Sequence, residues 1–236
     1  MFQPNNTPPE VREELDNEYL KKSKDLKSKN KALFEILDLP NRVGHTPFTV
    51  AIIKGYLKIA KLLLYLNMSD IDYKDKQEDT PLHWAIILRN YRAVYFLLEN
   101  GASIEHNNKM DNKAIMLATI HDVHEDFLGL LLKDWTSDKQ RRHYLVCHEE
   151  KIRKNITTVN KKGMTALHAA CINGNKVHLD ILVRAKGELK STDIKQMMPV
   201  HYAVVLDHAQ ILQNMHLNRD LYGGFEITGK EFNCQN

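Results

Sequence analysis

The stretch that decides the fold reads DTPLHWAIILRNYRAVYFLLENGA and spans residues 79–102. Thr80 is a favoured N-cap for a short helix, and Pro81 takes the first helical position, where its missing N–H costs nothing. A second, leucine-rich segment runs to Leu98, and the Asn-Gly pair ending at Gly101 is a typical helix C-cap. The stretch therefore predicts two short helices joined by a polar turn.

The same pattern recurs along the chain. The positions equivalent to Thr80 are Thr46, Lys113, Thr165 and Met198. The successive spacings are 34, 33, 52 and 33 residues, so three intervals share one period and one exceeds it by 19 residues. A single pair of short helices cannot bury its apolar faces, but stacked neighbours can. We therefore predict an all-α repeat fold, a solenoid of stacked helix-turn-helix units with short hairpin loops.

These motifs resemble the ankyrin repeat family. The resemblance is carried by the Thr-Pro-Leu-His run that starts at Thr80, by TALHAA at 165–170, and by the shared period. It covers residues 43–216, with a third unit that keeps Ala118 but lacks the Thr-Pro and His motifs. The resemblance implies a non-catalytic protein–protein interaction module in which the motif histidine has a structural role.

The repeat limits give a domain organisation. We expect an N-terminal helical cap at 1–42, because the end of a repeat array needs a polar outer face. Residues 43–216 form the array, and 217–236 form a C-terminal tail or the stub of a longer chain. The repeats lie near 43–76, 77–109, 110–133, 160–192 and 193–216, with an inserted helix at 134–158 that accounts for the long interval.

The composition excludes several classes of protein. The 236 residues include 33 Lys and Arg and 30 Asp and Glu, so the net charge is only +3, which argues against a protein that coats a polyanion. The apolar stretches are too short for a transmembrane helix. Without a Sec-type signal or a disulfide framework, we expect a cytoplasmic protein. The Lys- and Asn-rich composition is also compatible with a pathogen effector in the host-cell cytosol.

No group of residues predicts catalysis or metal binding. His143 and Cys147 could share a helix face, but structural zinc needs four ligands and no second pair stands nearby. A nucleophilic pair of His168 and Cys171 would need an orienting third group and an oxyanion hole. The family resemblance instead implies a structural role for His168 and a packing role for Cys171. No phosphate-binding glycine motif is present. We therefore expect no enzyme activity, no cofactor and no metal.

The expected function is binding of a protein partner by a monomer. In ankyrin proteins, partners usually meet the hairpin tips and the outward positions of the first helices, on the concave face. Apolar residues ringed by Lys and Asn are typical of an interface hot spot, with Trp84 as the preferred anchor, although they could instead tuck between repeats. The resemblance implies the contact residues Lys76, Gln77, Asp79, Trp84, Ile87, Leu88, Lys109, Met110, Asn112, His121, Lys161, Lys162, Met164 and Asn173.

Two alternatives stay open. The chain could be the binding region of a larger enzyme or effector. A basic patch on the inserted helix could be a solvated face or could bind an acidic protein surface. It could also bind acidic lipid or nucleic acid, which we do not expect as the main partner. The patch consists of Lys139, Arg141, Arg142, Lys151, Arg153 and Lys154.

Overall fold

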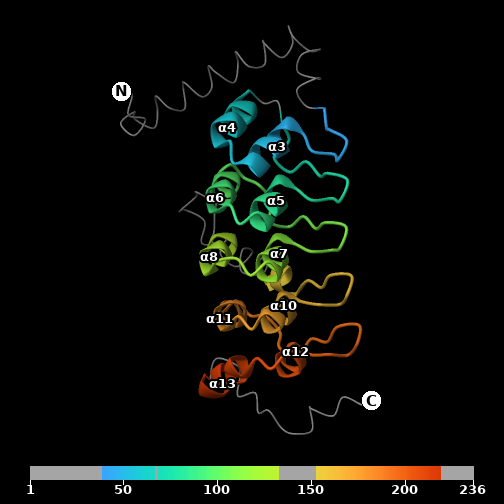
Figure 1. Cartoon of the computed structure of the whole chain (residues 1–236), viewed down its shortest axis with the longest axis vertical. Coiled ribbons are helices and arrows are strands. Elements are labelled where there is room, and N and C mark those ends of the chain that lie inside the picture. The colour runs from blue at the N-terminus through green and yellow to red at the C-terminus, as the bar shows by residue number, and fades with distance from the viewer. Residues whose placement is uncertain (1–38, 67–68, 133–152, 219–236) are drawn as a thin grey trace, which may run out of the picture.

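The computed structural model describes residues 39–66, 69–132 and 153–218. These residues form five consecutive helix pairs, which confirms the predicted all-α solenoid (Figure 1). The pairs are α3 (Pro47–Lys54) with α4 (Leu57–Tyr65), α5 (Pro81–Ile87) with α6 (Tyr91–Glu99), α7 (Ala114–Ile120) with α8 (Glu125–Leu132), α10 (Ala166–Asn173) with α11 (Lys176–Arg184), and α12 (Pro199–Val205) with α13 (Ala209–Leu217).

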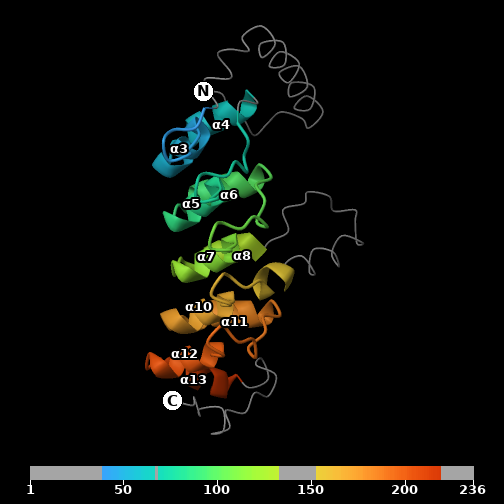
Figure 2. The same cartoon turned by 90° about the vertical axis from the view of Figure 1, so that its right-hand side faces the viewer.

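The helices stack in two layers. The first helices of the pairs, α3, α5, α7, α10 and α12, pack one on the next and form the inner layer. The second helices form the outer layer, and the hairpin loops project from the side of the inner layer (Figures 1 and 2). Each repeat therefore exposes a hairpin tip and the C-terminal end of an inner helix. We call the surface made by these two features the inner face.

Threonine side chains start the inner helices where the sequence predicts them. Thr46 Oγ1 accepts a hydrogen bond from the backbone N–H of Thr49 at 3.2 Å, and Thr80 Oγ1 accepts one from His83 at 3.4 Å. In the third unit the N-cap is Lys113, which makes no such bond. Its ammonium instead donates to Asn155 Oδ1 at 2.7 Å. The third helix pair thus forms without the usual cap.

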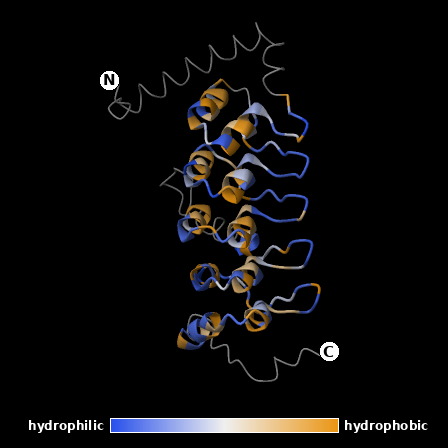
Figure 3. Ribbon diagram, viewed as in Figure 1, coloured by the Kyte–Doolittle hydropathy of each residue, from blue (hydrophilic) through white to orange (hydrophobic). Residues whose placement is uncertain are grey.

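The hydrophobic core runs between the two layers along the whole stack (Figure 3). Leu82, Leu97 and Leu167 are fully buried in it, as the leucine pattern predicts. Cys171 is also fully buried, and burial raises the pKa of its thiol to about 12. This cysteine is therefore a packing residue, because a protonated, inaccessible thiol is a poor nucleophile.

The long interval does not interrupt the stack. Helix α7 packs directly against α10 although residues 121–165 separate them in the chain. Of the predicted inserted helix, residues 153–157 are helical and Ile156 is buried, while residues 134–152 lie outside the described residues. The predicted N-terminal cap and C-terminal tail also lie outside them, except for residues 39–42 and 217–218. These three predictions stay predictions.

Candidate partner-binding surface

Each hairpin is braced by one Asn or Asp side chain that accepts two backbone hydrogen bonds. Asp75 Oδ1 accepts from the N–H groups of Gln77 at 2.8 Å and Asp79 at 3.0 Å. Side-chain oxygens of Asn and Asp favour turns because they replace a backbone acceptor. The brace gives every tip the same geometry, and it recurs at Asn41, Asn108, Asn160 and Asp193.

Neighbouring hairpins are also hydrogen-bonded to each other through their backbones. Three consecutive junctions each have one such bond, at 2.9, 3.0 and 3.2 Å, donated by Lys109 to Gln77, by Lys161 to Met110 and by Ile194 to Lys162. The second of these bonds spans the long interval. The tips are therefore held in register before any partner binds, which lowers the ordering cost of binding.

Most of the predicted tip residues reach solvent. Met110 is 45% exposed, and Met164 is partly buried. The structure brings these side chains together along one edge of the stack, because the tips stand side by side. Five of the polar tip residues are exposed, and they are Lys76, Gln77, Lys109, Lys161 and Lys162.

Asp79 and Asn112 are buried between the hairpins. Asn108 Nδ2 donates to Asp79 Oδ1 at 2.9 Å, and Asn160 Nδ2 donates to Asn112 Oδ1 at 3.1 Å. Burial raises the pKa of the Asp79 carboxyl, with a smaller opposing effect of the bond from Asn108. Because these polar groups serve the contact between repeats, we do not include Asp79 and Asn112 in the surface proposed below.

Trp84 is partly buried and is tied to its own hairpin. Its indole Nε1–H donates to Asp75 Oδ2 at 2.9 Å, and its ring meets His45 edge-to-face at a centroid distance of 5.0 Å. His45 Nε2 lies 3.2 Å from the same carboxylate oxygen. The sequence favours Trp84 as the anchor for a partner, but its polar end stabilises the junction of the first two repeats.

The C-terminal ends of the inner helices expose apolar side chains. Leu88 is 46% exposed and Ile120 is 38% exposed, while Ile87 packs against the core. The two polar residues predicted at these helix ends, Asn173 and His121, form hydrogen bonds within the stack. Asn173 Nδ2 donates to the Thr119 carbonyl at 2.7 Å, and the His121 carbonyl accepts from Arg89 at 2.6 Å.

Sequence reasoning did not single out the exposed side chains of the outer helix α4. Ile59 and Leu62, predicted within a leucine-rich packing helix, are 50% and 54% exposed. With Tyr56 and Tyr65 they form a stripe with a spacing of three residues, and that spacing is the signal that could have revealed it. An open pocket of about 630 Å³ lies beside this stripe, against Asn90 and Arg92.

The motif histidines are structural, as the family resemblance implies. His83 Nδ1 accepts from the Thr80 N–H at 3.1 Å, and its Nε2 lies 3.1 Å from the His106 carbonyl in the next hairpin. Burial lowers the pKa of His83 to about 4, so the ring is neutral near neutral pH. His168 repeats this arrangement with Thr165 and Met197, and burial lowers its pKa as well.

Of the predicted basic patch, only Arg153 and Lys154 lie in the described residues, and both are exposed. Arg153 lies 3.8 Å from Glu188. The other members, Lys139, Arg141, Arg142 and Lys151, lie outside the described residues, as do His143 and Cys147.

The described part of the chain contains neither a cluster of metal-binding side chains nor a membrane-spanning helix. In residues 39–66, 69–132 and 153–218, no three His, Cys, Asp or Glu side chains gather as a metal site. Within the same part of the chain, no helix combines the length and the apolar character needed to cross a membrane.

The stack of similar helix pairs with hydrogen-bonded hairpins shows that the chain is a repeat protein. In a comparison with known families, the family model "Ankyrin repeats (3 copies)" matches residues 18–108, 50–143 and 142–218. The chain therefore belongs to the ankyrin-repeat family, a generally non-catalytic interaction fold.

Curated relatives share this repeat but are much longer. Inversin of Canis lupus familiaris is 25% identical over 166 residues, which are 70% of this chain and 14% of inversin. Palmitoyltransferase AKR1 of Lachancea kluyveri is 25% identical over 72% of this chain and 21% of its own length. Protein phosphatase 1 regulatory subunit 12A of Mus musculus is 31% identical over 48% and 10%. The chain thus spans less than a quarter of each of these relatives.

Proposed function

We propose that this chain binds a partner protein on its inner face and performs no chemistry itself. The proposal rests chiefly on one observation. The inner face exposes apolar side chains on a rigid frame, with Leu88 and Ile120 at the helix ends and Met110 at a tip. Exposed apolar residues bordered by lysines match the core and rim of a protein interface.

The rigidity of the surface supports the same role. The tips are fixed by side-chain braces and by backbone bonds between repeats, so little conformational entropy is lost when a partner binds. Trp84 and Asp79 contribute by holding the tips in place. In this proposal Trp84 and Asp79 stabilise the surface that binds the partner, and they do not contact the partner themselves.

The test is affinity capture from eukaryotic cytosol with three forms of the chain. The inner-face variant is Leu88→Asp with Ile120→Asp. The matched control is Leu62→Asp with Val177→Asp on the outer helices α4 and α11, where the two side chains are 54% and 36% exposed. We expect a protein that is retained by the wild type and the control and lost by the inner-face variant. Loss with the control alone would contradict the proposal.

The alternative that the chain is the binding region of a larger enzyme or effector is supported by the lengths of the relatives, one of which is named as a palmitoyltransferase. A longer reading frame with a second domain would favour it. The expectations of a cytoplasmic location, a monomeric state and an effector role in a host cell stay predictions.

A further inference from the structure

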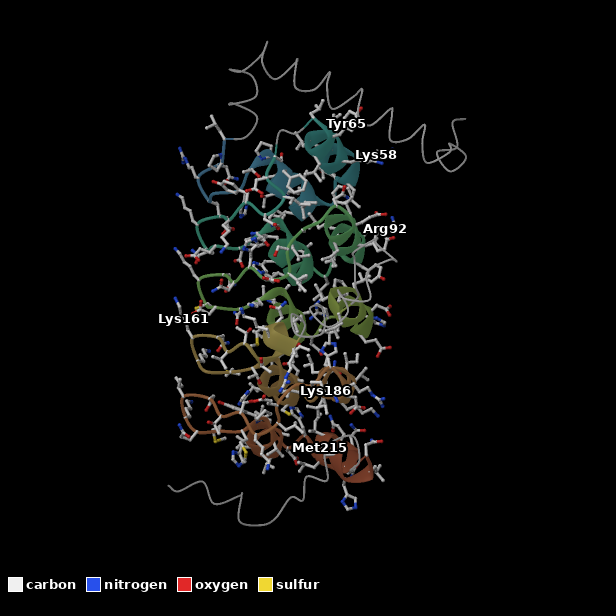
Figure 4. The ribbon with its side chains drawn as sticks, turned by 180° about the vertical axis from the view of Figure 1, so that it is seen from behind. Lys58, Tyr65, Arg92, Lys161, Lys186 and Met215 are labelled. Carbon is white, nitrogen blue, oxygen red and sulfur yellow. The ribbon has the colours of Figure 1, made fainter. Side chains whose placement is uncertain are left out.

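A row of basic residues follows the hairpin tips along the edge of the stack. At the first tip position it has Arg42, Lys76, Lys109 and Lys161 in successive repeats, and at the second position it continues with Lys162 and Lys195. All six residues are exposed, and we call them the basic ladder. Figure 4 shows Lys161 on this edge, on the other side of the stack from Lys58 and Arg92.

Within residues 39–66, 69–132 and 153–218, the charges of the basic ladder are not paired with acidic side chains. The hairpins also carry five acidic residues. Three of them, Asp75, Asp79 and Asp193, are buried and accept hydrogen bonds within the stack. The other two are Glu78 and Asp111, and Asp111 Oδ1 accepts a hydrogen bond from Asn107 at 2.7 Å. Among the side chains of this edge that reach solvent, six are cationic and two are acidic, so the exposed surface of the edge is positive. The edge therefore attracts an acidic ligand.

The spacing of the basic ladder limits what that ligand can be. Packed helices lie about 8–10 Å apart, so the tips recur at about that distance. An extended polyproline II segment has three residues per turn and rises about 3.1 Å per residue, so every third side chain lies on one face about 9 Å apart. A segment with an acidic residue at every third position thus matches the ladder, repeat by repeat.

We propose that the basic ladder binds an acidic, extended segment of the partner protein, with one carboxylate for every three residues. This inference rests on the proposed function, because it names the chemistry of part of the partner. The tips add apolar contacts for the residues in between, since Val43, Met110 and Ile194 are 54%, 45% and 69% exposed. Double-stranded DNA has about one charge per 1.7 Å, which is far denser than the ladder.

The probe is a labelled synthetic peptide of four Glu-Pro-Pro repeats, which favours the polyproline II conformation. The control peptide has the same composition with its four glutamates adjacent. Binding to the full chain is measured by fluorescence anisotropy at low salt and at physiological salt. We expect the repeat peptide to bind at least about tenfold more tightly than the control peptide, and more weakly at the higher salt concentration.

The variant that tests the residues is the triple charge reversal Lys76→Glu, Lys109→Glu and Lys161→Glu. We expect it to weaken binding of the repeat peptide by at least about tenfold while the helical circular dichroism spectrum stays unchanged. If the triple variant binds the repeat peptide with the same affinity as the wild type, the inference is wrong.

The matched control reverses three exposed lysines away from the ladder, Lys58→Glu, Lys61→Glu and Lys186→Glu. It changes the net charge by the same amount, so an equal loss of binding would overturn the inference by showing that only net charge matters. Equal affinity for the two peptides, or tighter binding of a single-stranded oligonucleotide of equal charge, would also overturn it. If a captured partner depends on Leu88 and Ile120 but not on the ladder, the inference fails and the proposed function stands.

Discussion

The motif histidines show how one residue links two repeats. His83 uses one ring nitrogen to accept from the Thr80 N–H and places the other against the His106 carbonyl of the next hairpin. Both roles need a neutral imidazole, in which one nitrogen accepts and the other donates. Protonation would turn the accepting nitrogen into a donor that faces another donor. The pH dependence of stability follows from this arrangement.

We predict that the free energy of unfolding falls as the pH is lowered from about 6.5 to about 4. The folded pKa of His83 is about 4, below the ordinary value of 6.5, so the unfolded chain binds a proton first and the stability present above 6.5 is lost in that window. The slope is up to about 1.4 kcal/mol per pH unit for each such histidine. Urea unfolding at several pH values measures it.

The control for this prediction compares the wild type with one substitution. His83→Gln should flatten part of the pH dependence, because glutamine does not bind a proton in this range. An equal slope in the wild type and His83→Gln would contradict the assignment of this effect to His83.

The hairpin tips require a left-handed backbone at one position. Gly44 and Gly163 stand there in two repeats, but Gln196 occupies it in the last hairpin with a φ of 59°. The left-handed conformation raises the free energy of an L-residue by about 1–2 kcal/mol, but it does not do so for glycine. We therefore predict that Gln196→Gly raises the free energy of unfolding by about 0.5–1 kcal/mol. Chemical denaturation measures the change. Lys195→Gly, one residue earlier, should instead destabilise the protein.

At the scale of the hairpin, whether the brace residue is Asp or Asn corresponds to the hydrogen-bond partner that lies beside it. The two hairpins braced by Asp have an aromatic donor nine residues later, and Trp84 donates to Asp75 at 2.9 Å as Tyr202 does to Asp193 at 2.6 Å. In the Asn hairpins the equivalent residues are apolar, and Asn108 and Asn160 donate to the preceding hairpin instead. The brace side chain thus has a hydrogen-bond partner outside its own turn at each of these four hairpins.

This matching predicts the effect of exchanging the partners at one junction. Asn108→Asp would place a second carboxylate against buried Asp79, so we expect a loss of about 2–3 kcal/mol in the free energy of unfolding. The double variant Asp79→Asn with Asn108→Asp restores a donor and an acceptor and should recover more than half of that loss. A double-mutant cycle by urea unfolding tests this. Additive effects would contradict the direct pairing.

The sequence is enough to predict the N-terminal caps of the inner helices but not these pairings between hairpins. Thr80 and Pro81 identify a helix start through local chemistry, which depends on neighbours in the chain. The bond from Trp84 to Asp75 depends on how the hairpin folds back over the helix, and the sequence alone does not specify that geometry. The sequence therefore predicts Trp84 as a partly buried anchor for a partner, but it does not predict the hydrogen bond that the indole makes within the protein.

At the scale of the whole molecule, the period of the sequence specified the solenoid. Each repeat packs only on its neighbours, so recognising one unit and its spacing predicts the stack. The third unit, whose cap position is Lys113, still forms helices α7 and α8 because its buried leucines keep the period. The sequence could not show that α7 packs directly on α10 across the long interval, since that contact joins distant segments.

The candidate surface was predicted only in part. Lys76, Lys109 and Lys161 are exposed at the tips, as expected from the repeat register. Asp79 and Asn112 share the same tips but are buried in contacts between hairpins, and burial depends on the neighbouring repeat. The division of tip residues into exposed and structural ones therefore required the structure.

The most direct measurement of the central claim uses a photo-crosslinking amino acid at a single position. One form carries it in place of Leu88 on the inner face, and the other carries it in place of Val177 on the outer helix α11. Both are illuminated in eukaryotic cytosol, and the crosslinked proteins are identified by mass spectrometry. The account predicts a partner crosslinked from position 88 and not from position 177. A partner crosslinked only from position 177 would contradict it.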